Sequence, residues 1–182
     1  IDKENQKLTL KEGEEIGYEK LVMATGSLPK RPSWLNGRDF ENVFTIAKQK
    51  DYLDTMKKKL EGKKQVTVIG GGFIGVEVAD ELAKSNRDVT IVEKLPHILE
   101  GAFDTEFTEK AEEILKNRGI ALKTGIGVTE IQGDKSADKV ILEDGSAMDT
   151  QAVILSMGYN PNSELASQWG IPVSEKGFIK VD

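Results

Sequence analysis

The sequence predicts an α/β fold in which a parallel sheet is followed by an antiparallel β-meander. The strongest observation is a βαβ unit, with a strand at 66–69, a run of glycines, a helix at about 73–84 and a second strand at 89–92. The second observation is another helix, periodic in apolar residues, that leads into a third strand. The third is a set of short alternating stretches, broken by glycine and aspartate, that favours a meander over a further helix.

Before the βαβ unit, the chain is predicted to be mostly extended. Residues 7–16 indicate a hairpin, because glycine separates short stretches of strand-forming residues. Residues 21–24 (Leu-Val-Met-Ala) indicate a buried strand. The stretch 26–37 holds the prolines, glycines and asparagine typical of a linker. We therefore expect a domain boundary near residue 30.

Two further helices are predicted. Thr45 is expected to cap the first and Asp104 the second, which ends at Gly119. The apolar positions that recur at helical spacing are Ile46, Leu53, Met56 and Leu60 in the first helix and Phe107, Ala111, Ile114 and Leu115 in the second. Both apolar faces are expected to pack in the core.

The other strands complete the sheet and the meander. They are predicted at 120–123, 128–131, 140–142, 147–148 and 152–157. The last of these is expected to be buried, because its residues are almost all apolar.

Composition excludes several classes of protein. The 25 Lys and Arg are scattered among 31 Asp and Glu, with a net charge of -6, so no continuous basic surface is expected for nucleic acid. With no cysteine, these residues hold no disulfide and no redox thiol, and we expect no metal site. No apolar run is long enough to span a bilayer, so we expect a cytoplasmic protein without a membrane partner. Because Ile1 stands in place of Met, we expect a piece of a longer chain.

The glycine run predicts a dinucleotide site. Gly70 allows a tight turn, Gly72 lets a pyrophosphate approach the backbone, and Gly75 lets helix and strand pack closely. The helix N-terminus that follows has free N–H groups and a dipole that attract phosphates. Ordinary turns also contain glycine, but here a strand precedes the run, a helix follows it, and Glu93 ends the next strand. This context indicates dinucleotide binding.

Glu93 indicates which nicotinamide cofactor binds. A carboxylate at the end of this strand accepts hydrogen bonds from the hydroxyls of the adenosine ribose, whereas a 2′-phosphate would meet like charge. The sequence therefore predicts NAD(H). Lys94 and Arg87 are nearby in the sequence and could offset the repulsion, so tolerance of NADPH stays an alternative. A solvated strand end is the plainer structural interpretation of Glu93.

Three stretches of the chain together resemble one family, the pyridine nucleotide-disulfide oxidoreductases, which are flavoproteins with two dinucleotide-binding domains. The stretches are 18–27, 70–93 and 152–166. In order, they resemble the exit from the FAD domain, the NAD fingerprint and the return into the FAD domain. The resemblance is greatest to the branch of NADH oxidase, NADH peroxidase and coenzyme A-disulfide reductase. It implies an FAD-domain remnant at 1–29, a Rossmann-like NAD(H)-binding domain at 30–150 and a return segment to the FAD domain at 151–182.

The resemblance also implies a hydride relay from NADH to FAD and on to a thiol, disulfide, peroxide or oxygen. Phe73 stands where the family has an aromatic gate over the flavin, usually a tyrosine, and Glu77 stands at a position that approaches the flavin. Gly158 resembles the glycine beside the nicotinamide, and Thr25 and Gly26 resemble an edge of the FAD site. The residues alone leave structural alternatives open. Phe73 could be a core residue at the start of the helix, Glu77 an exposed helical glutamate and Gly158 an ordinary turn glycine. The expected cofactor contacts are Gly70, Gly71, Gly72, Phe73, Ile74, Gly75, Glu77, Glu93, Lys94, Gly158, Thr25 and Gly26.

Several features of the family are absent from the sequence: the FAD fingerprint, the redox cysteine, the second FAD-contacting motif and the dimerisation domain. We therefore expect a fragment that binds nucleotide but performs no redox turnover alone, with no catalytic residue of its own. Its expected partners are the nucleotide cofactor and the missing FAD and dimerisation domains of the same polypeptide. The full-length parent is expected to be an FAD-dependent enzyme and a homodimer.

Two other functions stay open at the level of sequence. One is the NADH domain of a thiol-free electron-transfer flavoprotein, such as a rubredoxin or ferredoxin reductase or the flavin segment of a nitrite reductase. The other is a nucleotide-sensing module without chemistry. A short-chain dehydrogenase is excluded, because no tyrosine is followed four residues later by lysine. His97, the only histidine, is interpreted as an exposed loop residue near the adenine end, in preference to a catalytic acid.

Overall fold

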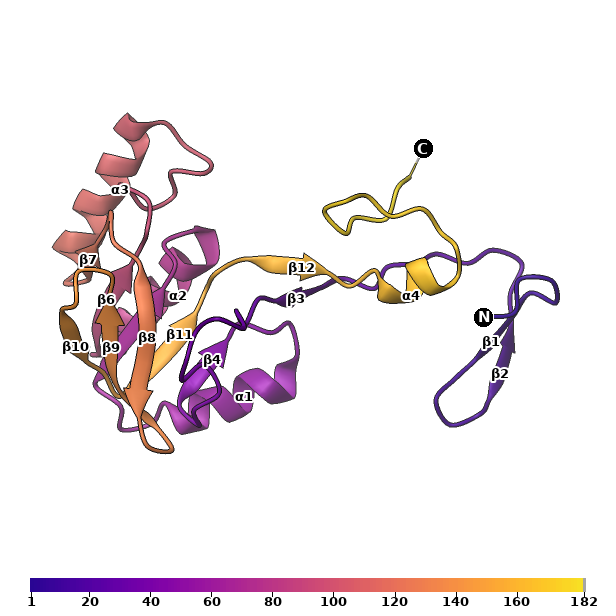
Figure 1. Ribbon diagram of the computed structural model, residues 1–182, viewed down its shortest axis with the longest axis horizontal. Coiled ribbons are helices and arrows are strands. Elements are labelled where there is room, and N and C mark those ends of the chain that lie inside the picture. Colours follow the sequence, from indigo (N-terminus) through magenta and orange to yellow (C-terminus); the bar gives the residue numbers. More distant parts are fainter. Residues whose placement is uncertain (182) are drawn as a thin grey trace. The chain divides into compact units, whose positions relative to one another are not determined.

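The structure, a computed structural model, describes residues 1–181 and contains two compact units. Unit 1 comprises residues 1–28 and the segment that begins at Asn160, and unit 2 runs from Pro29 to Tyr159 (Figure 1). Within the described residues, no helix has the length and apolar character needed to cross a membrane. Unit 2 holds the glycine run and the two strands that flank its helix.

Unit 2 is built on a five-stranded parallel sheet, which confirms the predicted α/β class. The strand order across the sheet is β4, β11, β5, β6, β7. Their bounds are β4 (Val43–Thr45), β5 (Gln65–Ile69), β6 (Asp88–Val92), β7 (Ala121–Lys123) and β11 (Ala152–Leu155). All four neighbouring pairs run parallel. Along the chain the strands advance across the sheet from β4 to β5, β6 and β7, and β11 then returns to the place between β4 and β5.

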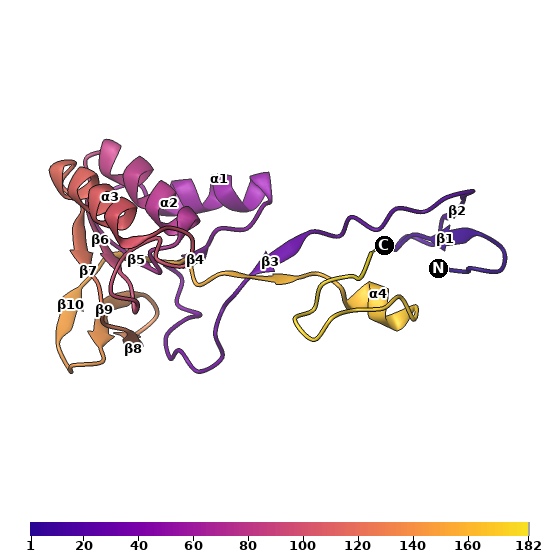
Figure 2. The same ribbon diagram turned by 90° about the horizontal axis from the view of Figure 1, so that it is seen from above.

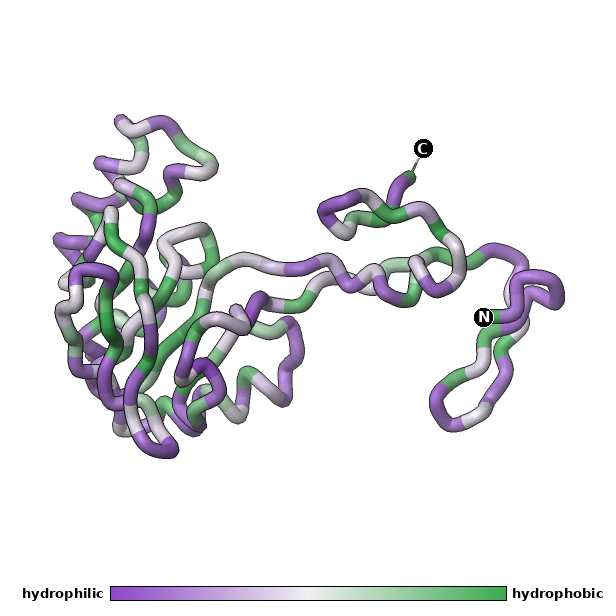
Figure 3. Tube along the Cα trace, in the orientation of Figure 1, coloured by the Kyte–Doolittle hydropathy of each residue, from purple (hydrophilic) through white to green (hydrophobic). Residues whose placement is uncertain are grey.

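Three helices cover one face of this sheet, and Figure 2 shows them on the opposite side from the meander. They are α1 (Lys50–Lys59), α2 (Phe73–Lys84) and α3 (Thr105–Asn117). In β5, Val66 and Val68 pack in the cluster on the helix side, whereas Ile69 packs in the cluster on the meander side. Hydrophobic colouring in Figure 3 follows the strands of the sheet. The sheet is therefore buried on both faces, as parallel sheets usually are.

The predicted meander is present on the other face of the sheet. It consists of β8 (Val128–Gly133), β9 (Ala137–Leu142) and β10 (Ala147–Asp149), paired antiparallel in the order β10, β9, β8. The buried side chain of Asn42 attaches it to the sheet. Its Nδ2 donates to the carbonyl oxygen of Ala137 at 2.8 Å, and its Oδ1 accepts from the N–H of Ala137 at 2.6 Å. A second bond from the same Nδ2 reaches the carbonyl of Gln151 at 2.8 Å.

Unit 1 contains the predicted hairpin, formed by β1 (Lys7–Thr9) and β2 (Glu15–Gly17). A short helix, α4 (Glu164–Gln168), follows later in the chain. Two strands, β3 (Ser27–Pro29) and β12 (Tyr159–Pro161), pair where the chain passes between the units. The buried strand predicted at 21–24 is wrong. No strand forms there and Val22 is 85% exposed, because no other described strand pairs with this stretch.

Three other predictions need correction. Thr45 does not cap α1, because it ends β4 and pairs with Leu155 of β11, and the helix starts later with Gln49 at its N-cap. The return segment expected from residue 151 does not begin with a strand of unit 1, since β11 belongs to the sheet of unit 2. On α3, Leu115 is buried as predicted, but Phe107 is 63% exposed and Ile114 is also exposed. Asp104 is the N-cap residue of α3 as predicted, although its side chain makes no capping hydrogen bond.

Candidate functional site: the glycine loop at the carboxyl edge of the sheet

The glycine run lies at the carboxyl end of β5, next to the end of β11. The two strands are parallel, hydrogen-bonded neighbours in the sheet, although they are far apart in the sequence. In open α/β sheets, ligands bind outside the carboxyl ends of the parallel strands. The two loops touch here, because a Cβ added to Gly70 would lie 2.3 Å from the carbonyl oxygen of Ser156. The topology therefore places the predicted motif at the position where this fold binds ligands.

Each glycine of the motif has a distinct geometric role. Gly70 has a φ of +108°, a conformation that disfavours any side chain, and Gly75 lies so close to Gly70 that its added Cβ would be 1.9 Å from the Gly70 carbonyl oxygen. Gly72 is different, because an added Cβ there has no neighbour within 4 Å. Two glycines thus allow close packing within the protein, and the third leaves open space outside the loop. This is the arrangement that lets a phosphate reach the backbone.

The start of α2 adds a positive electrostatic field at this open space. Gly72 is the N-cap of the helix, and no side chain caps its first turn. The first turn also contains no acidic residue. The backbone N–H groups of this turn are therefore available to an anion, and the helix dipole favours negative charge there.

Glu93 lies directly after β6 and connects its loop to the glycine run. Its Oε2 accepts a hydrogen bond from the N–H of Gly71 at 2.6 Å, and its Oε1 accepts one from the N–H of Leu95 at 2.8 Å. The residue is half-buried. A carboxylate has about four acceptor sites, so both oxygens retain capacity for the hydroxyls of a sugar. Sequence analysis placed Glu93 near the glycines, and the structure adds that it binds their backbone.

The loop after β6 also holds the glycine run from its other side. The N–H of Leu99 donates to the carbonyl oxygen of Gly71 at 2.8 Å. His97, in the same loop, is half-buried, and its Nδ1 lies 3.1 Å from Oε1 of Glu112 on α3. The prediction of an exposed histidine is therefore wrong. Glu112, which also accepts from the N–H of Ile98 at 3.3 Å, ties this loop to α3.

A cavity of about 130 Å³ opens beside Glu93 on the meander side of the sheet. Its lining includes Gly70, Glu93, Lys94, Trp34 and Glu143. Nζ of Lys94 lies 2.8 Å from Oε1 of Glu143, which comes from the turn after β9. The hydrogen bond from Lys94, followed by one from the N–H of Gly127, lowers the pKa of Glu143 below its usual value. The cavity thus has two carboxylates at its edge and one lysine that is already paired.

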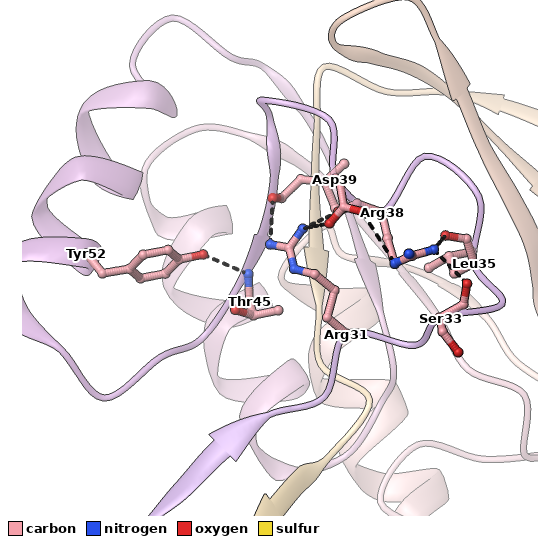
Figure 4. Close-up of polar contacts among 8 residues, drawn as sticks. Arg31, Ser33, Leu35, Arg38, Asp39, Thr45 and Tyr52 are labelled. Carbon is pink, nitrogen blue, oxygen red and sulfur yellow. Dashed lines mark hydrogen bonds and ion pairs between the residues drawn. The ribbon is translucent and has the colours of Figure 1, made fainter.

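Trp34 reaches this cavity from the loop that precedes β4, and two arginines hold that loop (Figure 4). Arg38 donates from Nη1 to the carbonyl of Ser33 at 2.6 Å and to that of Leu35 at 3.3 Å, the residues on either side of Trp34. Arg31 pairs with Asp39 at 3.3 Å. Trp34 remains 57% exposed, whereas Leu35 is fully buried. The loop therefore presents an aromatic side chain at the cavity.

Phe73 and Glu77 project from the first turns of α2. Phe73 is 60% exposed, so it does not belong to the buried core, and its ring packs edge-to-face on Phe103 with centroids 5.7 Å apart. Glu77 is exposed and Ile74 is half-buried. The two exposed side chains are available to a ligand or to another part of the protein.

The remaining predicted contacts fall at two places. Gly158, with a φ of +91°, follows β11 in unit 2, and its carbonyl accepts from the N–H of Lys30 at 2.9 Å. Thr25 and Gly26 lie in unit 1, where the carbonyl of Gly26 accepts from the N–H of Asn162 at 2.9 Å and the hydroxyl of Thr25 donates to the carbonyl of Asn162. Among the described residues, no group of three or more His, Cys, Asp or Glu could hold a metal.

Sequence analysis missed Trp34 and Glu143. Both belong to segments interpreted as turns, and turns commonly carry exposed polar residues. The one available signal was Trp34 itself, a large aromatic in a stretch of prolines and glycines. No signal pointed to Glu143, because its approach to Lys94 depends on how the meander folds over the sheet.

Comparison with known proteins gives consistent results. The family model described as Pyridine nucleotide-disulphide oxidoreductase matches residues 1–182. An NADH oxidase from Enterococcus faecalis is 33% identical over 170 residues, covering 93% of this chain and 37% of that protein. An NAD(P)H coenzyme A polysulfide/persulfide reductase from Pyrococcus horikoshii is 34% identical over 171 residues, covering 92% of this chain and 38% of that protein.

A solved ferredoxin reductase from Rhodopseudomonas palustris has the same fold, with a TM-score of 0.89 and 29% identity. The match covers 96% of this chain and 43% of that structure. The chain thus spans about two fifths of the length of the relatives that it matches.

Proposed function

This chain belongs to the pyridine nucleotide-disulphide oxidoreductase family, and we propose that it provides the NAD(H)-binding domain of an FAD-dependent oxidoreductase. The observation that carries the proposal is the loop at the end of β5, where Gly72 faces open space and Glu93 binds the backbone of Gly71. The two relatives with the highest identities reported above are named for NADH or NAD(P)H.

The residues present fit a dinucleotide. The open face of Gly72 and the uncapped start of α2 would hold the pyrophosphate, through backbone N–H groups and the helix dipole. Glu93 would accept hydrogen bonds from the adenosine ribose and thereby orient that end of the cofactor. Bound NADH supplies a hydride for a flavin. Phe73 and Gly158 are proposed to border the nicotinamide end of the cofactor, where they would exclude water from the nicotinamide ring.

We assign the FAD, the dimer and the catalysis to the whole protein. Residues 1–28 and the segment that begins at Asn160 would contribute to the FAD side, with Thr25, Gly26 and Glu77 as the proposed contacts. The chain holds a single glycine motif of this kind and no cysteine, so we expect it to be colourless and without redox turnover when purified alone.

The relatives are named for NADH oxidation, for polysulfide or persulfide reduction and for ferredoxin reduction, so their names differ in the electron acceptor. A thiol, disulfide, peroxide or oxygen acceptor fits the first two names. The likeness to a ferredoxin reductase favours a thiol-free electron-transfer flavoprotein as the second candidate.

Calorimetric titration tests the proposal. The protein is expected to bind NADH about ten- to a hundredfold more tightly than NADPH, because Glu93 opposes a 2′-phosphate. Gly72→Val is expected to weaken NADH binding by about a hundredfold or more, since two charge-assisted contacts of about 1.5 kcal/mol each would be blocked.

Gly101→Val is the matched control for Gly72→Val. Gly101 also lies in unit 2, its added Cβ also meets nothing within 4 Å, and it needs no positive φ. Its replacement is expected to leave the NADH affinity unchanged. Normal NADH binding by Gly72→Val would contradict the assignment of the pyrophosphate to this loop.

A further inference from the structure

Glu143 stands at the edge of the cavity that also holds Glu93, although the two come from different layers of unit 2. Glu93 follows β6 of the parallel sheet, and Glu143 follows β9 of the meander. Oε1 of Glu143 accepts from Nζ of Lys94 at 2.8 Å, and Oε2 accepts from the N–H of Gly127 at 3.1 Å. Each carboxylate oxygen of Glu143 therefore accepts a hydrogen bond from another residue.

The carboxylate of Glu143 also lies close to the backbone of Gly127. A Cβ added to Gly127 would lie 2.6 Å from Oε1 of Glu143, so the carboxylate occupies the space that a side chain would need. The N–H of Glu143 also donates to the carbonyl of Gly127 at 2.9 Å. Two hydrogen bonds thus join Gly127 and Glu143, and they orient the carboxylate of Glu143 towards Lys94.

Lys94 is the residue that could change the choice of cofactor. It directly follows Glu93, the proposed ribose ligand, and an ammonium group is a common partner of phosphate. NADPH differs from NADH by a phosphate on that ribose. While Lys94 is paired with Glu143, its charge is compensated, and an incoming phosphate would face two carboxylates.

We propose that Glu143 is a specificity-determining residue that makes the site reject a 2′-phosphate by holding Lys94 in an ion pair. The inference rests on the proposed function, because it refines the choice between NADH and NADPH at the same site. Its distinctive feature is that the determinant lies in the meander, outside the βαβ unit.

The test is the ratio of the dissociation constants for NADPH and NADH, measured by calorimetry on the purified protein. Glu143→Gln keeps the shape and the acceptor for Gly127 but removes the charge, and we expect the ratio to fall by about five- to tenfold. In the double variant Glu143→Gln/Lys94→Met, the ratio is expected to return to its original value. The decrease of this ratio in Glu143→Gln is also expected to become smaller as the salt concentration rises, because it depends on a contact between Lys94 and the phosphate.

Asp144→Asn is the matched control. It removes one negative charge from the same turn, but its carboxylate binds the N–H of Ser146 at 2.9 Å instead of Lys94. We expect an unchanged ratio. If the ratio fell as far in Asp144→Asn as in Glu143→Gln, net charge alone would determine the choice between NADH and NADPH. That result would overturn the inference.

Two further outcomes would overturn it. One is an unchanged ratio in a folded Glu143→Gln variant that still binds NADH. The other is a ratio that stays lowered when Lys94 is also replaced. Failure of the unmodified protein to bind either nucleotide is a separate result, because it would overturn the proposed function itself and this inference with it. Circular dichroism and a thermal melt of each variant identify loss of folding, and Glu143→Ala provides a second variant for the same comparison.

Discussion

Unit 2 buries apolar side chains in four of the five strands of its parallel sheet, β4, β5, β6 and β11, whereas in the described part of unit 1 the fully buried apolar residue is Ala166. Val22, Leu28 and Phe178 of unit 1 are exposed instead. Burial of apolar surface is the main source of folding free energy, at about 25 cal/mol per Å². The comparison indicates that unit 2 supports its own stability, while unit 1 contributes little. The glycine loop, Glu93 and Glu143 all belong to the stable unit.

The largest expected effect comes from replacing a core residue of unit 2. Ile91, in β6, is fully buried, and Ile91→Ala should lower the free energy of unfolding by about 2–5 kcal/mol through lost contacts and a cavity. Val22→Ala in unit 1 should change it by less than about 0.5 kcal/mol. Urea denaturation measures both. A similar loss from the two variants would contradict the comparison.

A medium effect is expected at Asn42, which joins the meander to the sheet. Asn42→Ala removes both bonds to Ala137 and the bond to Gln151, leaving buried backbone groups unpaired, so a loss of about 1–3 kcal/mol is expected. Asn162→Ala is the counterpart in unit 1, where the side chain is exposed and donates one longer bond of 3.3 Å. A loss below about 0.5 kcal/mol is expected there. Equal losses would mean that burial does not distinguish the two amides.

The smallest effect is expected on the outer surface of unit 2, where Asp80 of α2 pairs with Arg118 after α3 and with Lys84 at 2.9 Å. Hydrogen bonds from Arg118 and then Lys84 lower the pKa of Asp80. The stabilisation is therefore present above the unfolded-state pKa of about 3.9 and is lost as the pH falls through the lower pKa of the folded state. Asp80→Asn should cost about 0.2–1 kcal/mol near pH 7.

Urea denaturation across pH checks the sign of this effect. The difference between Asp80→Asn and the unmodified protein should be constant near neutral pH, should begin to decrease below about pH 4, and should vanish only below the lower pKa of the folded state. A difference that grows as the pH falls would contradict the assignment of the ion pairs.

The sequence predicted the parts of the molecule in which local signals agree. The bounds of α2 match the structure because glycines precede it, an apolar period runs through it and β-branched strands flank it. The meander was predicted because its turn residues are explicit. Thr45 was assigned wrongly because a threonine suits both a helix cap and a strand, and pairing with β11 decided between them. The stretch 21–24 has strand-forming residues, but a strand also needs a neighbour to pair with.

The candidate site divides in the same way. The glycines and Glu93 follow a spacing that the βαβ unit itself imposes, so the sequence was enough to bring them together. Trp34, Lys94 and Glu143 meet only because the linker loop and the meander fold onto the sheet edge. Contacts of this kind join residues that are far apart in sequence, and their spacing carries no period that a sequence pattern could show.

Both backbone polar groups of Gly71, its N–H and its carbonyl, are hydrogen-bonded to other residues of the protein. Glu93 accepts from its N–H, and the N–H of Leu99 donates to its carbonyl. A loop ordered in this way is preorganised, so little conformational entropy should be lost when a ligand binds. We would therefore expect association without a slow rearrangement of the backbone, and nearly identical loop conformations with and without the cofactor.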